Sequence, residues 1–191
     1  MRPTEKYSSN VWIKLQVRGL RHYLDECRQA KTYVSLDMEY GDIYAGFVLE
    51  VSKSWALLQL IHGFVEEGYL CIRLKDVVGY CEPSFMQSCM SSEGFDIGSM
   101  PPFKLPLNDL KAILAAINQK CRLFFIELDY CEERVRRLGH VSSFGSRTFT
   151  FRRMNPQGQW EKDPLRIPYS EVSGVSFGNR YCEIFDKYAE R

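Results

Sequence analysis

The sequence predicts a mainly β fold of the α+β class, made of two small five-stranded barrels in tandem. Each barrel is preceded by a helix, and a further helix lies at the C-terminus. Hydrophobic residues form 45% of the 191 residues, and 12 Phe, 11 Tyr and 3 Trp favour strands around a real core. One order of helical and strand periods also occurs twice. We therefore expect an N-terminal barrel in 1–83, a linker or long loop in 84–104, and a C-terminal barrel with its terminal helix in 105–191.

The first half begins with a helical period and then changes to strand periods. The i, i+3, i+4, i+7 spacing of one helix face relates Leu20, Tyr23, Leu24 and Cys27. A spacing of two, typical of a half-buried strand, relates Val34, Leu36 and Met38. Further strands are expected at about 43–51, 55–62, 69–74 and 77–81. Residues 84–104 have no period and many chain breakers, which is typical of a linker or long loop.

The same order begins again after residue 104. The helix starts near Asn108 or Asp109, and its apolar face contains Leu107, Leu110, Ile113, Leu114 and Ile117. Strands are expected at about 124–128, 135–143, 147–154, 159–168 and 171–177. Asn155-Pro156-Gln157-Gly158 has the residues of a type I turn. The last helix is capped by Asn179 and has one apolar face with Tyr181, Ile184, Phe185 and Tyr188.

Matched positions in the two halves indicate a duplicated unit. Gly46 matches Gly139, and a strongly bent strand needs such a residue without a side chain. Ile72-Arg73-Leu74 matches Leu165-Arg166-Ile167, at the same distance along the chain from each glycine. The alternative is one mixed α+β domain whose β segments are merely alike.

With these motifs the chain resembles the Sm-like family of small barrels. Val34–Gly46 resembles the first family motif, in which alternating apolar residues lead through a turn to a glycine. Ile72-Arg73-Leu74 followed by Val77-Val78-Gly79-Tyr80 resembles the second motif. The later half, with Trp160, Arg166–Tyr169 and Phe177–Tyr181, is also similar to small uncharacterised bacterial proteins. The resemblance covers most of the chain outside the linker and implies a helix and five bent strands in each half.

The resemblance implies RNA binding less directly than it implies the fold. Sm-like RNA binders hold bases with a loop that carries Asp or Asn after the second strand. The matching stretches, Ser52–Trp55 and Phe144–Arg147, contain no Asn, and the glycine that follows the family arginine is replaced by Leu74 and Ile167. Only Arg73 and Arg166 match the motif, so the fold can be shared without the RNA-binding activity.

The strongest local signal for a ligand lies in residues 134–153, which hold six arginines, no acidic residue and three interleaved phenylalanines. Clustered arginines bind phosphates, and aromatic rings stack on unpaired bases. The candidate nucleic-acid-binding residues are Arg73, Arg136, Arg137, Arg147, Arg152 and Arg166. We favour a plainer interpretation, a solvated basic hairpin paired with Glu127, Asp129, Glu132 and Glu133, because Phe149 and Phe151 are expected to face the core.

Composition excludes several other classes of function. A net charge of +1 leaves no whole-protein field that would capture nucleic acid or an anionic membrane. No apolar run is long enough to span a bilayer, and the first residues lack a signal peptide, so we expect a cytoplasmic protein. Seven cysteines without a Cys-x-x-Cys pair favour reduced thiols, with Cys71 and Cys121 as buried hydrophobes, and no metal or cofactor is expected. His140 lies near basic residues, which would lower its pKa if they are close in space.

These observations predict a non-enzymatic module that binds another protein or assembles with copies of itself. Small barrels with open edges associate through strand pairing, and two barrels per chain could build a pseudo-symmetric ring. The first alternative is an RNA-binding protein that uses the arginine-rich surface of the second barrel. The second is a small cytoplasmic enzyme, for which the sequence offers no catalytic constellation.

Overall fold

The structure is a computed structural model that describes residues 13–14, 17–130 and 133–189. The first half contains a helix and six strands. They are β1 (Ile13–Lys14), α1 (Val17–Ala30), β2 (Tyr33–Met38), β3 (Ile43–Val51), β4 (Trp55–His62), β5 (Val65–Arg73), the 3-10 turn η1 (Leu74–Asp76) and β6 (Val77–Cys81). The helix α2 (Ser84–Ser92) follows in the stretch that connects the halves.

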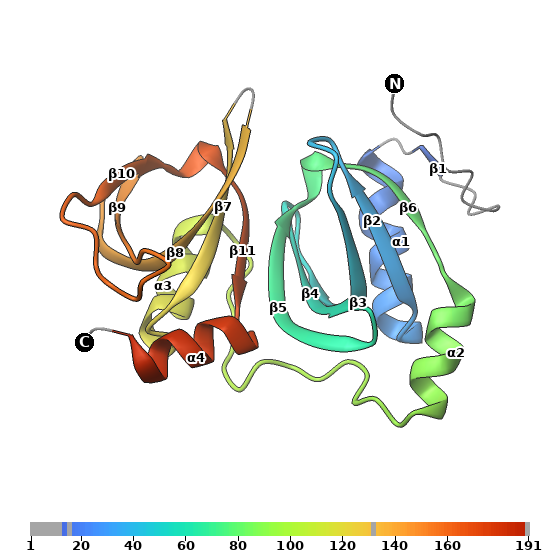
Figure 1. The fold of residues 1–191 in the computed structure, drawn as a ribbon. Helices are drawn as coiled ribbons and strands as arrows, with labels where there is room; N and C mark the ends of the chain where they lie inside the picture. Colours follow the sequence, from blue (N-terminus) through green and yellow to red (C-terminus); the bar gives the residue numbers. More distant parts are fainter. Residues whose placement is uncertain (1–12, 15–16, 131–132, 190–191) are drawn as a thin grey trace, which may run out of the picture.

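The second half has the same order of elements as the first (Figure 1). They are α3 (Leu110–Lys120), β7 (Phe124–Tyr130), β8 (Glu133–Phe144), β9 (Thr148–Arg153), β10 (Leu165–Pro168), the 3-10 turn η2 (Tyr169–Glu171) and β11 (Val172–Phe177). The helix α4 (Arg180–Tyr188) ends the described chain. Apart from β1, α2 and α4, the described elements of both halves therefore follow the same order: a helix, four strands, a 3-10 turn and a last strand.

One antiparallel sheet runs through both halves, and this differs from the expectation of two separate closed barrels. Its eleven described strands have the order β1-β6-β2-β3-β4-β5-β11-β7-β8-β9-β10, which is open at both ends. Each half contributes its five strands in the same relative order, with its last strand beside its first. The mainly β, α+β class is confirmed, whereas closure is not. The fourth strand of the first half, β5, pairs with the last strand of the second, β11, and so leaves no free edge between the halves.

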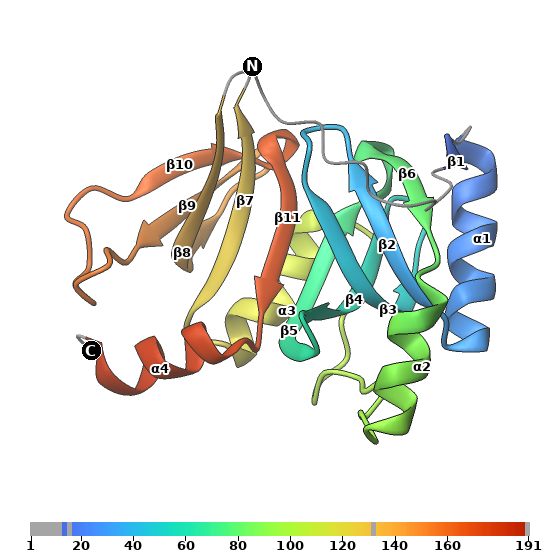
Figure 2. The same ribbon diagram turned by 45° about the vertical axis from the view of Figure 1, so that its right-hand side comes forward.

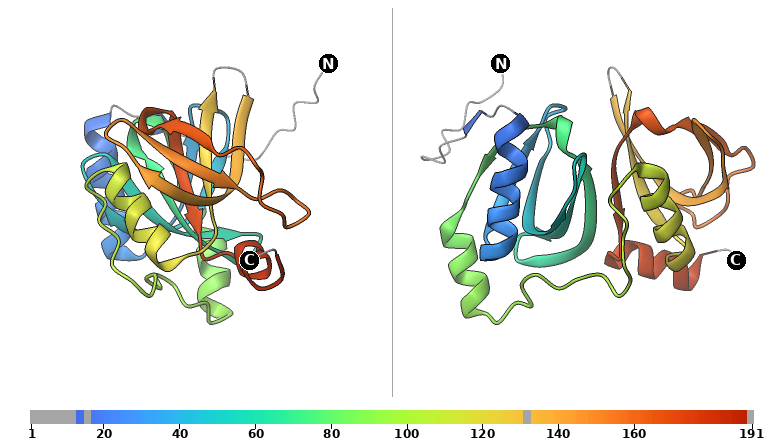
Figure 3. Two further views of the ribbon diagram at one scale, coloured as in Figure 1. Left: turned by 90° about the vertical axis from the view of Figure 1, so that its left-hand side faces the viewer. Right: turned by 180° about the vertical axis from the view of Figure 1, so that it is seen from behind.

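Figure 3 shows α1 and α3 lying against their respective halves. The core under α1 belongs to the first half, whereas the core under α3 also includes residues of β3, β4 and β5, namely Leu49, Trp55, Leu57 and Cys71. The predicted apolar faces are buried: Leu20, Leu24 and Cys27 on α1, and Leu110, Ile113, Leu114 and Ile117 on α3. Asp109 caps α3 by accepting a hydrogen bond from the backbone N–H of Ala112 at 2.9 Å. Burial of these faces on the curved sheets is the main source of stability.

The glycines matched in the sequence lie where the neighbouring strand leaves no room for a side chain. A Cβ on Gly46 would lie 2.0 Å from the backbone oxygen of Gln59, and a Cβ on Gly139 would lie 2.0 Å from that of Arg152. Gly46 lies in β3 and Gly139 in β8, the second strand of each half. The bend expected at these positions therefore brings backbone against backbone in both halves.

The structure confirms two elements predicted from local sequence patterns and contains one helix that no such pattern predicted. Gly158 N–H donates to Asn155 O at 3.0 Å, which confirms the predicted turn. Asn179 caps α4 through a 2.8 Å bond from Cys182 N–H, as expected. The helix α2 was not anticipated within 84–104, because only Met90 of its residues is fully buried and one buried position creates no period.

Candidate functional site

Two buried carboxylates lie where the two halves meet. Glu127 on β7 is 3% exposed, and Asp76 at the end of η1 is 4% exposed. A buried carboxylate requires hydrogen-bond partners, because removal of a charge from water is costly. Both residues find partners in what we call the joint, which consists of the paired strands β5 and β11 and the side chains that connect the halves. In the joint, Gly174 lies opposite Ile72 and Phe177 opposite Tyr69.

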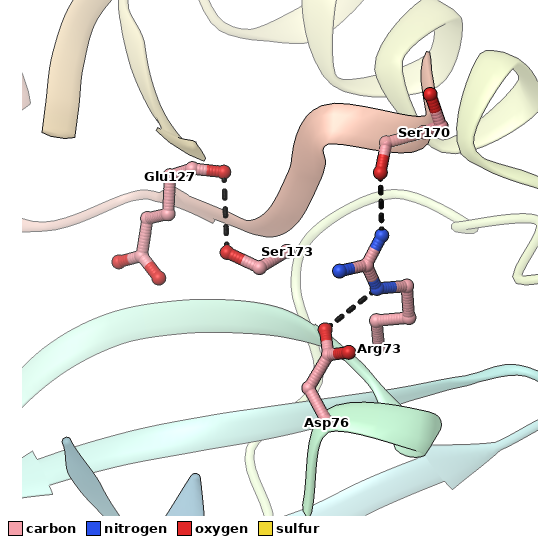
Figure 4. Close-up of polar contacts among 5 residues, drawn as sticks. All are labelled: Arg73, Asp76, Glu127, Ser170 and Ser173. Carbon is pink, nitrogen blue, oxygen red and sulfur yellow. Dashed lines mark hydrogen bonds and ion pairs between the residues drawn. The ribbon is translucent and has the colours of Figure 1, made fainter. Parts of the chain in front are cut away.

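Glu127 connects the halves through a tyrosine. The hydroxyl of Tyr44, on β3 of the first half, donates to Glu127 Oε2 at 2.6 Å. Arg136 Nε lies 3.8 Å from Glu127 Oε1, and Ser173 Oγ donates to the backbone oxygen of Glu127 at 3.3 Å, a bond drawn in Figure 4. Beside them is an open cavity of about 360 Å³ whose lining includes Asp42, and partial burial raises the pKa of that carboxyl group.

Arg73, the first of the predicted nucleic-acid-binding residues, also lies in the joint (Figure 4). Its Nε donates to Asp76 Oδ2 at 2.6 Å, and its Nη1 donates to the backbone oxygen of Ser170 at 2.8 Å. The side chains of Arg73 and Asp76 are only 15% and 5% exposed. The guanidinium group thus links the end of β5 to η2 of the second half, where it neutralises a buried carboxylate.

Arg166, the residue that matches Arg73 in the second half, has a different position. It is exposed on β10, and its Nε donates to Thr148 Oγ1 at 3.0 Å. Arg147 lies beside Thr148 at the same end of the β9–β10 pair, where its backbone oxygen accepts a bond from Tyr169 N–H at 3.1 Å. Arg147 and Arg166 therefore form a small exposed group at one end of the second half.

Arg152 belongs to a third place, an aromatic and cationic cluster around Trp160. The guanidinium carbon of Arg152 lies 4.7 Å from the Trp160 ring centroid, and that of Arg122 lies 5.7 Å away. The His140 ring is 4.7 Å from Trp160. Burial, followed by the charges of Arg152 and Arg122, lowers the pKa of His140. The shift expected from the sequence is thus confirmed, with burial as its largest cause.

Arg136 and Arg137 occupy a fourth place, beside the end of β9. The Arg136 guanidinium lies 4.0 Å from the Phe125 ring centroid, and its Nη2 donates to Ser176 Oγ at 2.8 Å. Arg137 lines a cavity of about 220 Å³ together with Arg153. The Nε atoms of Arg137 and Arg153 are buried and donate to no acceptor within the described part of the chain. Arg153 also forms an ion pair with Glu161 through its Nη2, so the unmet hydrogen-bonding capacity of these two side chains lies on their enclosed Nε atoms.

The six predicted arginines thus do not form one patch, although Arg136 extends from the end of β9 to Glu127 and Ser176 of the joint. Phe149 and Phe151 are buried in the core, as the alternation predicted, and offer no stacking surface. Sequence reasoning did not single out Tyr44 or Trp160 as parts of a site. Nothing in the local sequence indicates the contact between Tyr44 and Glu127, because these residues are 83 positions apart.

Burial makes three of the described thiols poor nucleophiles. Burial raises the pKa of Cys27 to about 11 and that of Cys182 to about 12, and it also raises the pKa of Cys71. Such groups stay protonated near neutral pH, whereas the thiolate is the nucleophile. Within the described residues, no three His, Cys, Asp or Glu side chains gather as a metal ion would require.

Comparison with known proteins adds no relative: no family model, no curated protein and no solved structure matches this chain. None of the described helices has both the length and the apolar character needed to cross a bilayer.

Proposed function

We propose that this protein is a non-enzymatic binding module in which two Sm-like small barrels, one from each half, form an internal pair. The observation that carries the proposal is the pairing of β5 with β11. These are non-equivalent strands, the fourth of one half and the last of the other, joined over the register Ile72↔Gly174 to Tyr69↔Phe177. Such a head-to-tail contact between like units is heterologous. It leaves the last strand of the first half, β6, toward one end of the sheet and the fourth strand of the second half, β10, at the other.

The polar groups of the joint support a structural role for its buried charges. Asp76 is neutralised by Arg73, and Glu127 accepts a hydrogen bond from Tyr44. In both cases the partners hold the two halves together or stabilise the end of the joint strand. Carboxylates engaged in this way are poor candidates for proton transfer, because their lone pairs already have partners.

The outer ends of the sheet support a single pair over a ring of copies. At one end, β1 covers β6 at Gly79 and Tyr80. At the other, β10 spans four residues, ends with Pro168 and is preceded by Pro164. Tyr169 N–H donates toward β9. Because backbone directions alternate along a strand, the backbone groups at positions 164, 166 and 168 face away from β9, toward the free edge. Two of these three residues are prolines, which have no N–H to donate. Prolines and short strands are common protections of an exposed edge.

Sedimentation velocity and hydrogen exchange test the proposal together. We expect one species with the mass of a single chain at micromolar concentration. We also expect the joint amides of Cys71 and Val175, which lie opposite each other, to exchange only with global unfolding, and Arg166 N–H on β10 to exchange fast. A defined oligomer would contradict the single internal pair and favour a ring of copies. Fast exchange at both joint positions would show that the two halves are not paired.

RNA remains the alternative ligand, favoured by the cluster of Arg122, Arg152 and His140 around Trp160. Its test is filter binding of single-stranded RNA across a range of salt concentrations. Phosphate contacts would make the affinity fall steeply with salt, by roughly 0.7 log unit per log unit of salt for each phosphate contacted. An absent or salt-insensitive signal removes RNA.

A further inference from the structure

The strand β8 has an edge that no other described strand covers. It pairs with β7 from Glu133↔Tyr130 to Gly139↔Phe124, but its pairing with β9 begins only at Gly139↔Arg153. Figure 2 shows β7 and β8 continuing together past the end of β9. The segment of β8 before Leu138 therefore has one neighbouring strand instead of two.

The direction of the backbone groups along this edge follows from one hydrogen bond. Met154 N–H donates to Leu138 O at 2.9 Å, so the backbone groups of Leu138 face the β9 side. Because these directions alternate along a strand, the N–H and C=O of Arg134 and Arg136 face the same side. We call this backbone segment, residues 134–136, the open β8 edge. It offers two donors and two acceptors in the geometry of a strand.

A cationic cavity adjoins the open β8 edge. Its volume is about 220 Å³, and its charged lining residues are Arg136, Arg137, Arg153 and Glu161. Glu161 forms an ion pair with Arg153 and lies near no second described cation of the cavity at ion-pair distance. Glu161 thus offsets the charge of Arg153, and Glu127, 3.8 Å from Arg136, partly offsets that of Arg136. The buried Nε atoms of Arg137 and Arg153 have no acceptor among the described residues.

Aromatic rings complete the rim of the cavity. Phe125, which lies under the Arg136 guanidinium, and Tyr181 of α4 line both this cavity and a neighbouring one of about 450 Å³. Tyr181 is 48% exposed, and its ring lies 5.5 Å from that of Phe125. The rim can therefore contact the apolar parts of a bound chain, while the guanidinium groups take its charged parts.

We propose that the open β8 edge binds an extended, carboxylate-rich peptide segment of a partner protein as an added strand. This assignment rests on the proposed function and names the partner of the binding module. Main-chain hydrogen bonds to the edge give the affinity common to all extended peptides, and Arg137 and Arg153 select side chains with carboxylates. A peptide fits better than RNA because phosphates would satisfy the guanidinium groups but leave the strand edge unpaired.

Fluorescence anisotropy with designed peptides tests the proposal. The probe is a labelled ten-residue peptide in which Thr and Glu alternate, and the comparison peptides alternate Thr with Lys or carry N-methyl groups on alternate backbone nitrogens. We expect binding of the acidic peptide only. The double variant Arg137→Gln, Arg153→Gln should weaken it at least tenfold, because it removes the charge-assisted hydrogen bonds to the carboxylates of the peptide.

The control for each single replacement, Arg137→Gln or Arg153→Gln, is Arg21→Gln, which removes one exposed positive charge on α1 and should bind within twofold of the wild type. Circular dichroism of each variant separates lost binding from lost folding. The proposal is overturned if the control loses as much affinity for the acidic peptide as the arginine variants, or if the folded double variant binds it as tightly as the wild type. Absence of binding of the acidic peptide overturns it as well. Binding of a uridine decamer but not of the peptide assigns the cavity to RNA instead. Each of these failures leaves the sedimentation and exchange tests of the internal pair unaffected, so the two proposals fail separately.

Discussion

Replacement of Gly139 by alanine should destabilise the protein far more than an ordinary surface substitution. The added Cβ would lie 2.0 Å from Arg152 O, whereas ordinary contacts begin at 3.4 Å. To accommodate the methyl group, β8 and β9 must move apart by about 1.4 Å, which stretches an N–H···O bond beyond the usual range of roughly 2.7–3.2 Å. Two lost ladder bonds and the buried groups left unpaired amount to about 4 kcal/mol.

Urea unfolding followed by tryptophan fluorescence measures this effect. Gly46→Ala should lose a similar free energy of unfolding, because its Cβ would lie 2.0 Å from Gln59 O. The control is Gly63→Ala, where no atom lies within 4 Å of the added Cβ and only the left-handed φ of +53° is unfavourable, at about 1 kcal/mol. If Gly139→Ala stays within about 1 kcal/mol of the wild type, β8 and β9 do not approach as described.

Three further outcomes are expected. Arg73→Met, which leaves the 5% exposed Asp76 side chain without its ion-pair partner, should lower the free energy of unfolding by about 3 kcal/mol, and Arg73→Lys by less; equal, small losses in urea titrations would contradict this. Because the pKa of His140 is lowered in the folded state, its contribution to stability is complete above the unfolded pKa, near 6.5, and is lost as the pH falls below that value. Arg152→Gln should raise this pKa in an NMR titration, and an unchanged pKa would show that the charge of Arg152 does not lower it. Cys71 should resist iodoacetamide at pH 8 until the protein unfolds, and its native labelling, read by peptide mass spectrometry, would contradict its burial.

Elements governed by local chemistry could be predicted from the sequence. The helical spacing of Leu20, Leu24 and Cys27 predicted the buried face of α1, since each position of that face meets the same core. Asn155 and Gly158 specified a turn, because a side-chain acceptor and a residue with positive φ suffice to form it. In each case the information lies within a few residues.

Features that depend on distant partners could not be predicted. Of the four residues predicted for the apolar face of α4, Phe185 packs against the core, whereas Tyr181, Ile184 and Tyr188 are all at least 41% exposed, and Cys182 is buried instead. Which side of a short helix contacts the sheet depends on the position of the neighbouring strands. Similarly, alternation predicted the strands β5 and β11 but could not indicate that each would find the other at its edge.

Arg73 and Arg166 illustrate why residues that are matched between the halves by sequence need not share a position or a function. Arg73 ends a strand whose outer edge is covered by β11, so its guanidinium is drawn into the joint and neutralises Asp76. Arg166 lies on β10, which has β9 on one side and no described strand on the other, and its side chain bonds to Thr148 at the surface. Their places in the repeat also differ, because Arg73 directly precedes η1, whereas Pro168 and not Arg166 directly precedes η2. Substitution of Arg166 by methionine should therefore change the free energy of unfolding by less than about 0.5 kcal/mol, in contrast to Arg73→Met.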